Sequence, residues 1–512
     1  MSTPSALPAE AEHQAALAAP AGGKPSFWAS PAVKTLLSIA VGLILWAIIP
    51  AGDDLTEIGV RFIAILTASM VMWIAVGTDW TALLFLGLLV IGGILTPAQV
   101  WAGSIGNPIV ILVLVYTMLA VCLSRNGVID AMTAWFISRP FVKGRPYAFM
   151  AMLFAANFAL GIIMHNFAIF VVFLNITIRL CKALGIEKGH SLYILLMLGN
   201  LWVDGVINWA SPIAKTIPNV IIGLLEEQLG VTITYMQWLA VGLPFMVVML
   251  GVILLTIRIL NPDVSSLRDL DVDAFVANTP KMNARGWIAV AAVTLVVAIT
   301  VIPEIFLTLG LFTGVSAWIM DLGIAVPAIV AIAVLALTKV KGQAVLDAPA
   351  TFKEVPLSML VFVGAIMVMG GPLNSPDTGV IAWLSNMLDP IFGGMAPLLI
   401  ITFAVVGSIA LTNFISNTVA AILFLNLGIA IFLGMGGIST PLIIGFAIAL
   451  ALASSLAVLT PSATIVTPMI FDGGHITMGN SFKYNMLFVA LTFVVVVAFV
   501  PLISWMMPML GA

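Results

Sequence analysis

Charged residues are scarce in this chain, and their scarcity excludes a soluble fold. Only 8% of its 512 residues are Asp, Glu, Lys or Arg, whereas soluble globular proteins carry roughly 25%. Hydrophobic residues make up 62% of the sequence, and the mean hydropathy is +1.20. Apolar runs of roughly 20 residues, enough to cross about 30 Å of hydrocarbon, recur from residue 33 onward. The sequence therefore predicts an integral membrane protein with many spans.

Residue types that carry enzyme chemistry are also few. The two cysteines, Cys122 and Cys181, show neither paired nor ligand-like spacing, so both are expected to be free thiols. The sequence contains no His/Asp/Glu metal cluster, Cys/His pair or phosphate-binding loop. Its formal net charge of -3 gives no reason to expect nucleic-acid binding. We therefore expect no enzyme, no nucleic-acid partner and no cofactor.

Residues 1–32 have no apolar run and are rich in Ala, Pro and Ser, which predicts a disordered cytoplasmic tail. A cleaved signal peptide needs a basic stretch and an apolar core at its start. The first span is therefore expected to stay in the protein.

Long apolar runs that end at turn or polar residues define the predicted spans. They cover 33–50, 59–77, 79–95, 107–124, 147–180, 192–225, 237–259, 286–302, 322–338, 356–372, 396–434, 441–471 and 485–508. Polar residues interrupt two of these runs near their middles, at His165-Asn166 and around Ser416-Asn417. Such interruptions favour hairpins that enter and leave from one face.

Basic residues near span ends accumulate on the cytoplasmic side. Basic clusters lie on both sides of the run 147–180, so a hairpin opening to the cytoplasm fits better than a single crossing. These residues are Arg125, Arg139, Lys143, Arg145, Arg179, Lys182 and Lys188. Counting from a cytoplasmic N-terminus gives a hairpin from outside at 396–434 and an outside C-terminus. Arg61 and Lys215 are exceptions, and Lys215 falls in mid-membrane.

The two halves show the same order of spans, hairpin, interrupted helix and last span, in opposite orientations. This order predicts an all-α polytopic membrane protein with inverted-topology repeats, about eleven transmembrane helices, two re-entrant hairpins and two broken helices. The first repeat, with an additional N-terminal span, covers 33–260, a cytoplasmic linker covers 261–285, and the second repeat covers 286–512. Such repeats place a binding site at the bilayer midplane and serve alternating access.

Three motifs of the second half carry a family resemblance: Leu411–Thr418, Pro461–Thr464 and Phe471–Thr477. Their letters, spacing and order resemble the second repeat of the divalent anion sodium symporter family. The resemblance implies secondary transport of small organic anions by a homodimer in the cytoplasmic (inner) membrane, with sodium as coupling ion.

The resemblance also implies site residues. A sodium ion would be held by Thr412, Ser416, Asn417 and the carbonyl of Ala463. The substrate carboxylate would meet Ser416, Asn417 and Thr418 at the hairpin tip, and Thr464 would face the anion. Hydroxyl, amide and carbonyl oxygens suit sodium, and helix N-termini suit an anion. Hydrogen bonding of these side chains to neighbouring helices is the alternative interpretation.

The first repeat departs from the family pattern. His165-Asn166-Phe167 replaces Ser-Asn-Thr, so only Asn166 is retained, and Gly161 stands where a hydroxyl would serve sodium. Phe167 would shrink the anion site, so the substrate need not be a C4 dicarboxylate. In the interrupted helix Lys215-Thr216 replaces Gly-Thr, while a second register would use Ser211-Pro212. The first register brings Pro218-Asn219 onto the family's Pro-Asn and is preferred.

An intramembrane lysine is expensive to insert and is expected to be functional. We expect the Lys215 ammonium, or a protonated His165, to take the place of the first sodium ion beside the anion. Asp204 is the candidate counter-ion. A structural Lys215–Asp204 pair and a helix-capping His165 remain alternatives.

The sequence thus predicts a secondary active transporter of di- or tricarboxylate anions, sodium-coupled with a reduced first sodium site. A sodium-independent anion exchanger is an alternative within the same class. A sodium/proton antiporter or channel of the same superfamily is an alternative in which His165, Asp204 and Lys215 would carry protons.

Overall fold

The computed structural model describes residues 30–511 apart from 53, 163–165, 213–214, 273, 275–281, 324, 356, 393, 415–416, 436–437, 461–462, 465 and 472–473. The described residues form helices almost throughout, with one antiparallel strand pair, β1 (Lys339–Val340) and β2 (Gln343–Ala344). The all-α expectation is therefore confirmed. Most of the predicted N-terminal tail lies outside the described residues, and its last two positions, 31 and 32, begin the first described helix.

Helices of the first half follow the predicted runs closely. They are α2 (Pro31–Ile48), α3 (Glu57–Ala75), α4 (Asp79–Ile91), α5 (Pro97–Gly103), α6 (Pro108–Arg125), α7 (Val128–Ile137), the 3-10 turn η2 (Pro140–Val142), α8 (Pro146–Gly161), α9 (Asn166–Ala183), α10 (Ser191–Ala210), α11 (Thr216–Leu229) and α12 (Tyr235–Leu260). The run 147–180 is divided into α8 and α9, and the run 192–225 into α10 and α11, where polar residues interrupt them.

The second half begins after the short α13 (Ser265–Arg268). Its helices are α15 (Ala284–Thr308), α16 (Thr313–Asp321), α17 (Ala325–Leu337), α18 (Ala348–Glu354), α19 (Leu357–Asn374), α20 (Val380–Phe392), α21 (Pro397–Thr412), α22 (Asn417–Met435), α23 (Thr440–Ala453), α24 (Thr467–Phe471) and α25 (Met478–Met509). From α5 to α12 and from α18 to α25 the elements follow the same order, including a helix hairpin and a helix that ends at a break.

Local sequence signals explain where the paired elements begin. Both hairpins start with proline at the first helical position, at Pro146 in α8 and Pro397 in α21, where no intrahelical N–H bond is lost. The short helix α5 also begins with proline, and α18 has one at its second position; side chains of Thr96 and Asp347 cap the two helices. The sequence analysis missed α5, α7, α16, α18 and α20, which are short or lie beside longer apolar runs.

Seven helices among the described residues are long and apolar enough to cross a membrane, or up to nine if each bent pair forms one span. The bent pairs are α16 with α17, at 78°, and α18 with α19, at 63°. The hairpin arms α8 and α21 have 16 residues each, shorter than the roughly 20 that a crossing needs. The count of about eleven spans and the inverted orientation of the repeats stay predictions.

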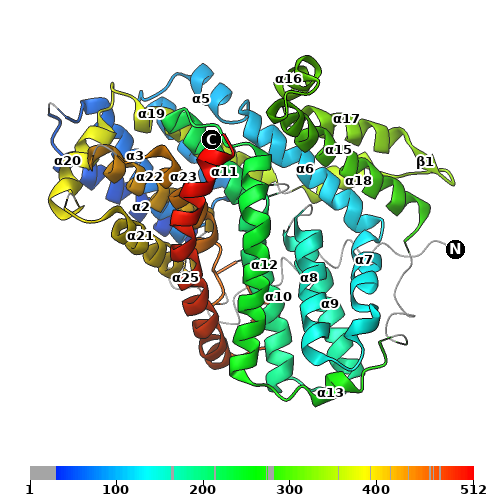
Figure 1. Ribbon diagram of the computed structural model, residues 1–512. Coiled ribbons are helices and arrows are strands. Elements are labelled where there is room, and N and C mark those ends of the chain that lie inside the picture. Colours follow the sequence, from blue (N-terminus) through cyan, green and yellow to red (C-terminus); the bar gives the residue numbers. More distant parts are fainter. Residues whose placement is uncertain are drawn as a thin grey trace.

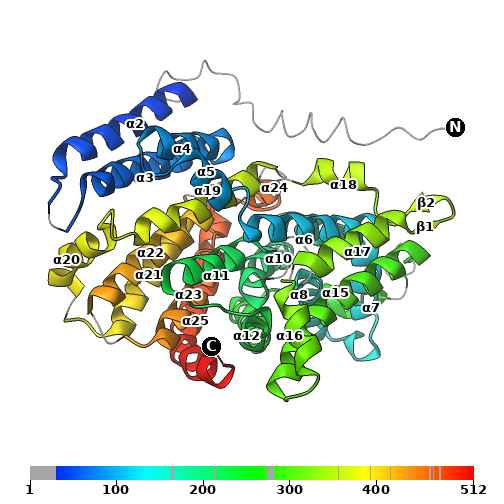
Figure 2. The ribbon, with the colours of Figure 1, turned by 90° about the horizontal axis from the view of Figure 1, so that it is seen from above.

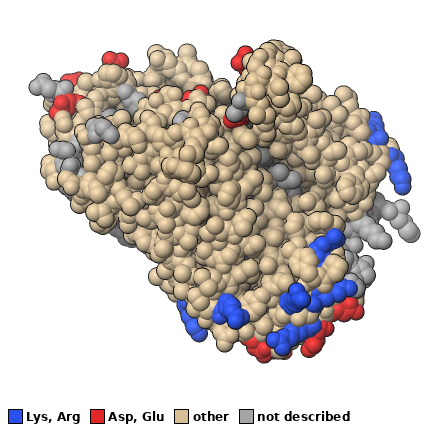
Figure 3. All heavy atoms as spheres, in the orientation of Figure 1, with Lys and Arg blue, Asp and Glu red and all other residues tan. Residues whose placement is uncertain are grey.

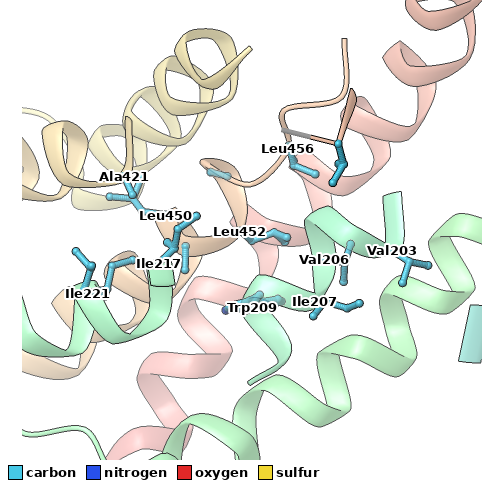
Figure 4. Close-up of a cluster of buried hydrophobic side chains, with 14 of the residues drawn as sticks. Val203, Val206, Ile207, Trp209, Ile217, Ile221, Ala421, Leu450, Leu452 and Leu456 are labelled. Carbon is cyan, nitrogen blue, oxygen red and sulfur yellow. The ribbon is translucent and has the colours of Figure 1, made fainter. Parts of the chain in front are cut away.

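The helices pack around a centre formed by α10, α11, α12, α23 and α25 (Figure 1). In the perpendicular view α2, α3 and α4 lie at one edge, and α15 to α18 lie at another (Figure 2). Residues 443–453 of α23 are buried throughout. Figure 4 shows apolar side chains of α10 and α11, such as Ile207 and Ile217, near Leu450 and Leu452 of α23. Both breaks therefore sit against one tightly packed apolar centre.

Charged side chains gather at the edges of the face shown in Figure 3. Basic side chains occur along the lower edge, where some acidic ones accompany them, and at the right, whereas the upper edge shows acidic side chains. The broad uncharged band between these edges has the composition expected of a surface in contact with lipid.

Candidate functional site

The first break, between α10 and α11, is held open by one buried asparagine. Ser211 and Lys215 both have extended backbone conformations. Asn219 Nδ2 donates to the carbonyls of Pro212, at 2.6 Å, and Lys215, at 2.5 Å, and its Oδ1 accepts from the Tyr235 hydroxyl at 2.5 Å. The side chain thus ties the Pro212 carbonyl, which also accepts from the Lys215 N–H at 3.2 Å, to the first turn of α11 and to Tyr235 of α12. The sequence analysis used Asn219 only to choose the register, and it missed Tyr235.

Lys215 lies at this break and reaches the tip of the first hairpin. Its side chain is only 2% exposed, and its ammonium donates to Oδ1 of Asn166, the first residue of α9. Asn166 Nδ2 donates to the Asp204 carbonyl and to Asn208 Oδ1, each at 3.1 Å. The Asp204 carboxylate attracts the Lys215 ammonium. The structure therefore brings Asn166, Asp204 and Lys215 together, while His165 lies outside the described residues.

Gly161, at the end of α8, leaves no room for the hydroxyl that a first sodium site would need. A Cβ atom at this position would lie 2.2 Å from Cδ1 of Ile207 on α10, far inside van der Waals contact. Thr216, the first residue of α11, places its Oγ1 3.4 Å from the sulfur of Met359. The first half of the chain thus presents a packed glycine where a hydroxyl would serve sodium, and a lysine where the family pattern has glycine.

The second hairpin brings several oxygen atoms together at its tip. Thr412, the last residue of α21, is fully buried. Its Oγ1 lies 2.9 Å from Oδ1 of Asn417, the first residue of α22, and also donates to the Ser454 carbonyl. Ser454 follows the last turn of α23. Ser416 lies outside the described residues, and Thr418 is half-buried in the first turn of α22.

Asn413 links the second hairpin to the chain after α23. Its Nδ2 donates to the carbonyls of Ile409, at 2.7 Å, and Leu456, at 3.3 Å, and its Oδ1 accepts from the Leu459 N–H at 2.8 Å. Thr460 donates to its backbone carbonyl. Asn413 thus holds the second break as Asn219 holds the first. Its role was not foreseen from the sequence, where it reads only as part of a polar interruption.

Ala463 and Thr464 lie just after this segment. Ala463 is buried, and its N–H donates to the Thr460 carbonyl at 3.2 Å. The Thr464 hydroxyl accepts from the N–H groups of Val466 and Thr467, at 3.2 Å each, at the start of α24. In this conformation Thr464 therefore forms a turn at the second break, and a contact with an anion stays a prediction.

Helix α10 lies against the start of the second break. A Cβ atom at Gly205 on α10 would lie 2.8 Å from the Ser455 carbonyl, so the two backbones touch. Asp204 precedes Gly205, and Ser454 precedes Ser455. That the polar tips of the two hairpins meet at one site stays a prediction.

The third motif connects the repeats at the basic end of the molecule. His475, between α24 and α25, stacks on Tyr193 of α10 with ring centroids 5.9 Å apart, and its Nδ1 lies 2.5 Å from the tyrosine hydroxyl. Burial, together with the charge of Lys188, lowers the pKa of His475 below its usual value. Both effects favour the neutral imidazole.

Comparison with known proteins identifies the family of the chain. A family model described as "Citrate transporter" matches residues 65–451. The chain belongs to the citrate transporter family. This membership and the relatives below confirm the resemblance to divalent anion symporters and show a membrane transporter, not an enzyme.

Two curated relatives of this family member are transporters from bacteria. The "Sodium-dependent dicarboxylate transporter SdcS" of Staphylococcus saprophyticus is 24% identical over 477 residues, covering 88% of each chain. An "Uncharacterized transporter" of Haemophilus influenzae is 24% identical over 371 residues, covering 71% of this chain and 74% of the relative. The crystal structure of the YdaH transporter of Alcanivorax borkumensis has a similar fold, with a TM-score of 0.54 and 13% identity over 92% of this chain and 98% of that one.

Proposed function

We propose that the protein moves a small di- or tricarboxylate anion across the cytoplasmic membrane by alternating access, coupled to sodium at one site only. The observation that carries this proposal is the cluster of Thr412 Oγ1, Asn417 Oδ1 and the Ser454 carbonyl. The relative SdcS, named as a sodium-dependent dicarboxylate transporter, supports the ion and the substrate class.

The oxygen cluster suits a small hard cation. The Thr412 hydroxyl has one proton, and two oxygens that act as acceptors, Asn417 Oδ1 and the Ser454 carbonyl, lie beside it. A sodium ion placed among these three oxygens would be coordinated by all of them, because hard cations prefer oxygen ligands. Ser416 and the Ala463 carbonyl complete the proposed set.

The anion is proposed to bind beside this ion. Asn417 and Thr418 form the first turn of α22, where backbone N–H groups and the helix dipole favour negative charge. Among the described residues, Asn417 Nδ2 donates no hydrogen bond, so it remains available to a carboxylate. Thr464 and, from the first repeat, Thr216 complete the proposed contacts.

Lys215 is proposed to supply the cation of the first repeat. Its ammonium donates to the Asn166 oxygen, which would otherwise be available to an ion. Gly161 packs so closely against Ile207 that a side chain with a hydroxyl would not fit there. This arrangement also favours a second candidate function, a sodium-independent anion exchanger, because a built-in positive charge can balance an anion without a transported ion. Asp204 is the proposed counter-ion of the unloaded state.

The proposed orientation places the N-terminus in the cytoplasm and the C-terminus outside. The Lys and Arg side chains gathered along the lower edge, away from the upper edge where the chain ends, support it (Figures 1 and 3). A homodimer is proposed from the family resemblance alone.

Counterflow into proteoliposomes tests the proposal. Vesicles preloaded with unlabelled succinate or citrate would be exposed to the labelled anion, with and without sodium on both sides. Accumulation that requires sodium supports the symporter, and equal accumulation without sodium supports the exchanger. If neither labelled anion accumulates, but an added sodium gradient drives proton flux in the same vesicles, the result would instead indicate the antiporter.

A further inference from the structure

A separate cavity of about 470 Å³ lies near the acidic edge of the molecule. Residues from the N-terminal end of α6, from α11, from the start of α12 and from α15 to α17 form its walls. It therefore lies between helices of the first repeat and the first helices of the second repeat. Figure 2 shows four of the helices that form its walls, namely α6, α11, α15 and α16.

The cavity combines apolar walls with two carboxylates. Most of its lining is aliphatic, including Ile222 and Ile299. Glu226 and Glu304 line it as well, and Glu304 accepts a 2.6 Å hydrogen bond from the Thr234 hydroxyl. No Lys or Arg occurs among the described lining residues. The cavity is thus both apolar and electronegative.

We propose that this cavity binds an amphipathic organic cation, a protonated amine on an apolar body, and that the bound amine slows transport. The volume is typical of sites for small organic ligands, which are mostly apolar with a few convergent polar groups. A bare metal ion would leave most of the volume and the aliphatic walls without contacts. The ammonium would lie between Glu226 and Glu304, and the apolar body against Ile222 and Ile299.

The effect on transport follows from the connection to the first break. Tyr235 lines the cavity and donates to Asn219, which holds the Pro212 and Lys215 carbonyls. A ligand that bridges α11 and α15 would oppose movement of the broken helix relative to the first helices of the second repeat. The slowing of transport rests on the proposed alternating-access function, whereas binding of the amine does not.

Binding to the purified full-length protein tests the site directly. 2-Phenylethylamine and its uncharged analogue 2-phenylethanol would be titrated by calorimetry at neutral pH. We expect the amine to bind, and Glu304→Gln and Glu226→Gln each to weaken it at least about tenfold. The amide introduced by Glu304→Gln keeps an oxygen that can accept from the Thr234 hydroxyl. Glu187→Gln, an exposed change at the basic end, should leave the affinity unchanged.

Three outcomes would overturn the site: equal binding of the alcohol, unchanged amine affinity in both glutamine variants, or no amine binding. If Glu304→Gln does not fold, Ile299→Phe, which fills the cavity and leaves both carboxylates in place, should abolish binding.

In counterflow, the amine should lower the maximal rate and leave the KM for the anion unchanged. A raised KM would place the amine in the anion site and contradict the proposal. A protein that binds the amine but moves no anion would contradict the proposed function and leave the site standing.

Discussion

The two hairpin-tip asparagines have different hydrogen-bond environments. Asn166 uses its oxygen for the Lys215 ammonium and both amide hydrogens for Asp204 and Asn208. Asn417 shares its oxygen with Thr412, and its amide hydrogens meet no described acceptor. We therefore interpret Asn166 as the residue that positions Lys215, and Asn417 as the one that meets both ion and anion.

Replacing Asn417 with Ala should lower anion transport by roughly 10- to 100-fold, because hydrogen bonds to charged groups contribute about 1.5–3 kcal/mol. Counterflow at saturating sodium measures the loss. Asn175→Ala provides the control, since Asn175 is exposed and bonds only within α9. Wild-type rates in Asn417→Ala would remove Asn417 from the site.

Lys215→Gly should create or strengthen sodium dependence if the ammonium takes the place of an ion. The glycine carbonyl remains at the break, and the Asn166 oxygen becomes available to sodium. The measurement is the sodium concentration for half-maximal counterflow in the variant and the wild type. Loss of expression would instead support the structural Lys215–Asp204 pair, because removing one partner leaves a buried charge unpaired.

At the scale of elements, hydropathy predicted the long helices but not how the breaks are held. The runs 237–259, 286–302 and 485–508 correspond to α12, α15 and α25 because apolar length alone defines them. The hairpins and breaks were also visible, as polar letters within apolar runs. The contacts of Asn219 with Tyr235 and of Asn413 with Leu456 and Leu459 depend on tertiary structure, which no local pattern contains. The packing of Gly161 on Ile207 is equally invisible in the sequence.

Asn219→Ala should destabilise the protein by about 2 kcal/mol, since it removes two hydrogen bonds to backbone carbonyls and leaves the buried Tyr235 hydroxyl without its acceptor. Tyr235→Phe, which removes one of these bonds, should cost about 1 kcal/mol or less. Thermal unfolding of the detergent-solubilised protein would rank the two variants. Equal stability of Asn219→Ala and wild type would show that the break is held by other contacts.

At the scale of the whole molecule, the charge moved per cycle follows from the number of ions. A dianion that travels with one sodium carries a net charge of -1, whereas exchange of identical anions carries none. Moving one charge changes the free energy by about 2.3 kcal/mol per 100 mV. The asymmetry between the two repeats therefore has an electrical signature.

An inside-negative potential should slow net uptake of succinate with one sodium and leave succinate–succinate counterflow unchanged. Potassium-loaded proteoliposomes with valinomycin provide the potential, and labelled succinate provides both readouts. Vesicles without valinomycin are the control. Faster net uptake under an inside-negative potential would mean that at least three sodium ions accompany each dianion, and it would contradict the single-site proposal.

In the proposed mechanism Lys215 also limits how steep a gradient the protein can build. Each ion that travels with a nutrient multiplies the attainable concentration ratio by that ion's own ratio, whereas a lysine that stays in the chain leaves the ratio unchanged. A transporter with one sodium site would therefore concentrate its anion less than one with two sites, and it would depend less on the sodium of its surroundings. That combination would suit a cell that releases or trades abundant acids better than one that scavenges traces of them.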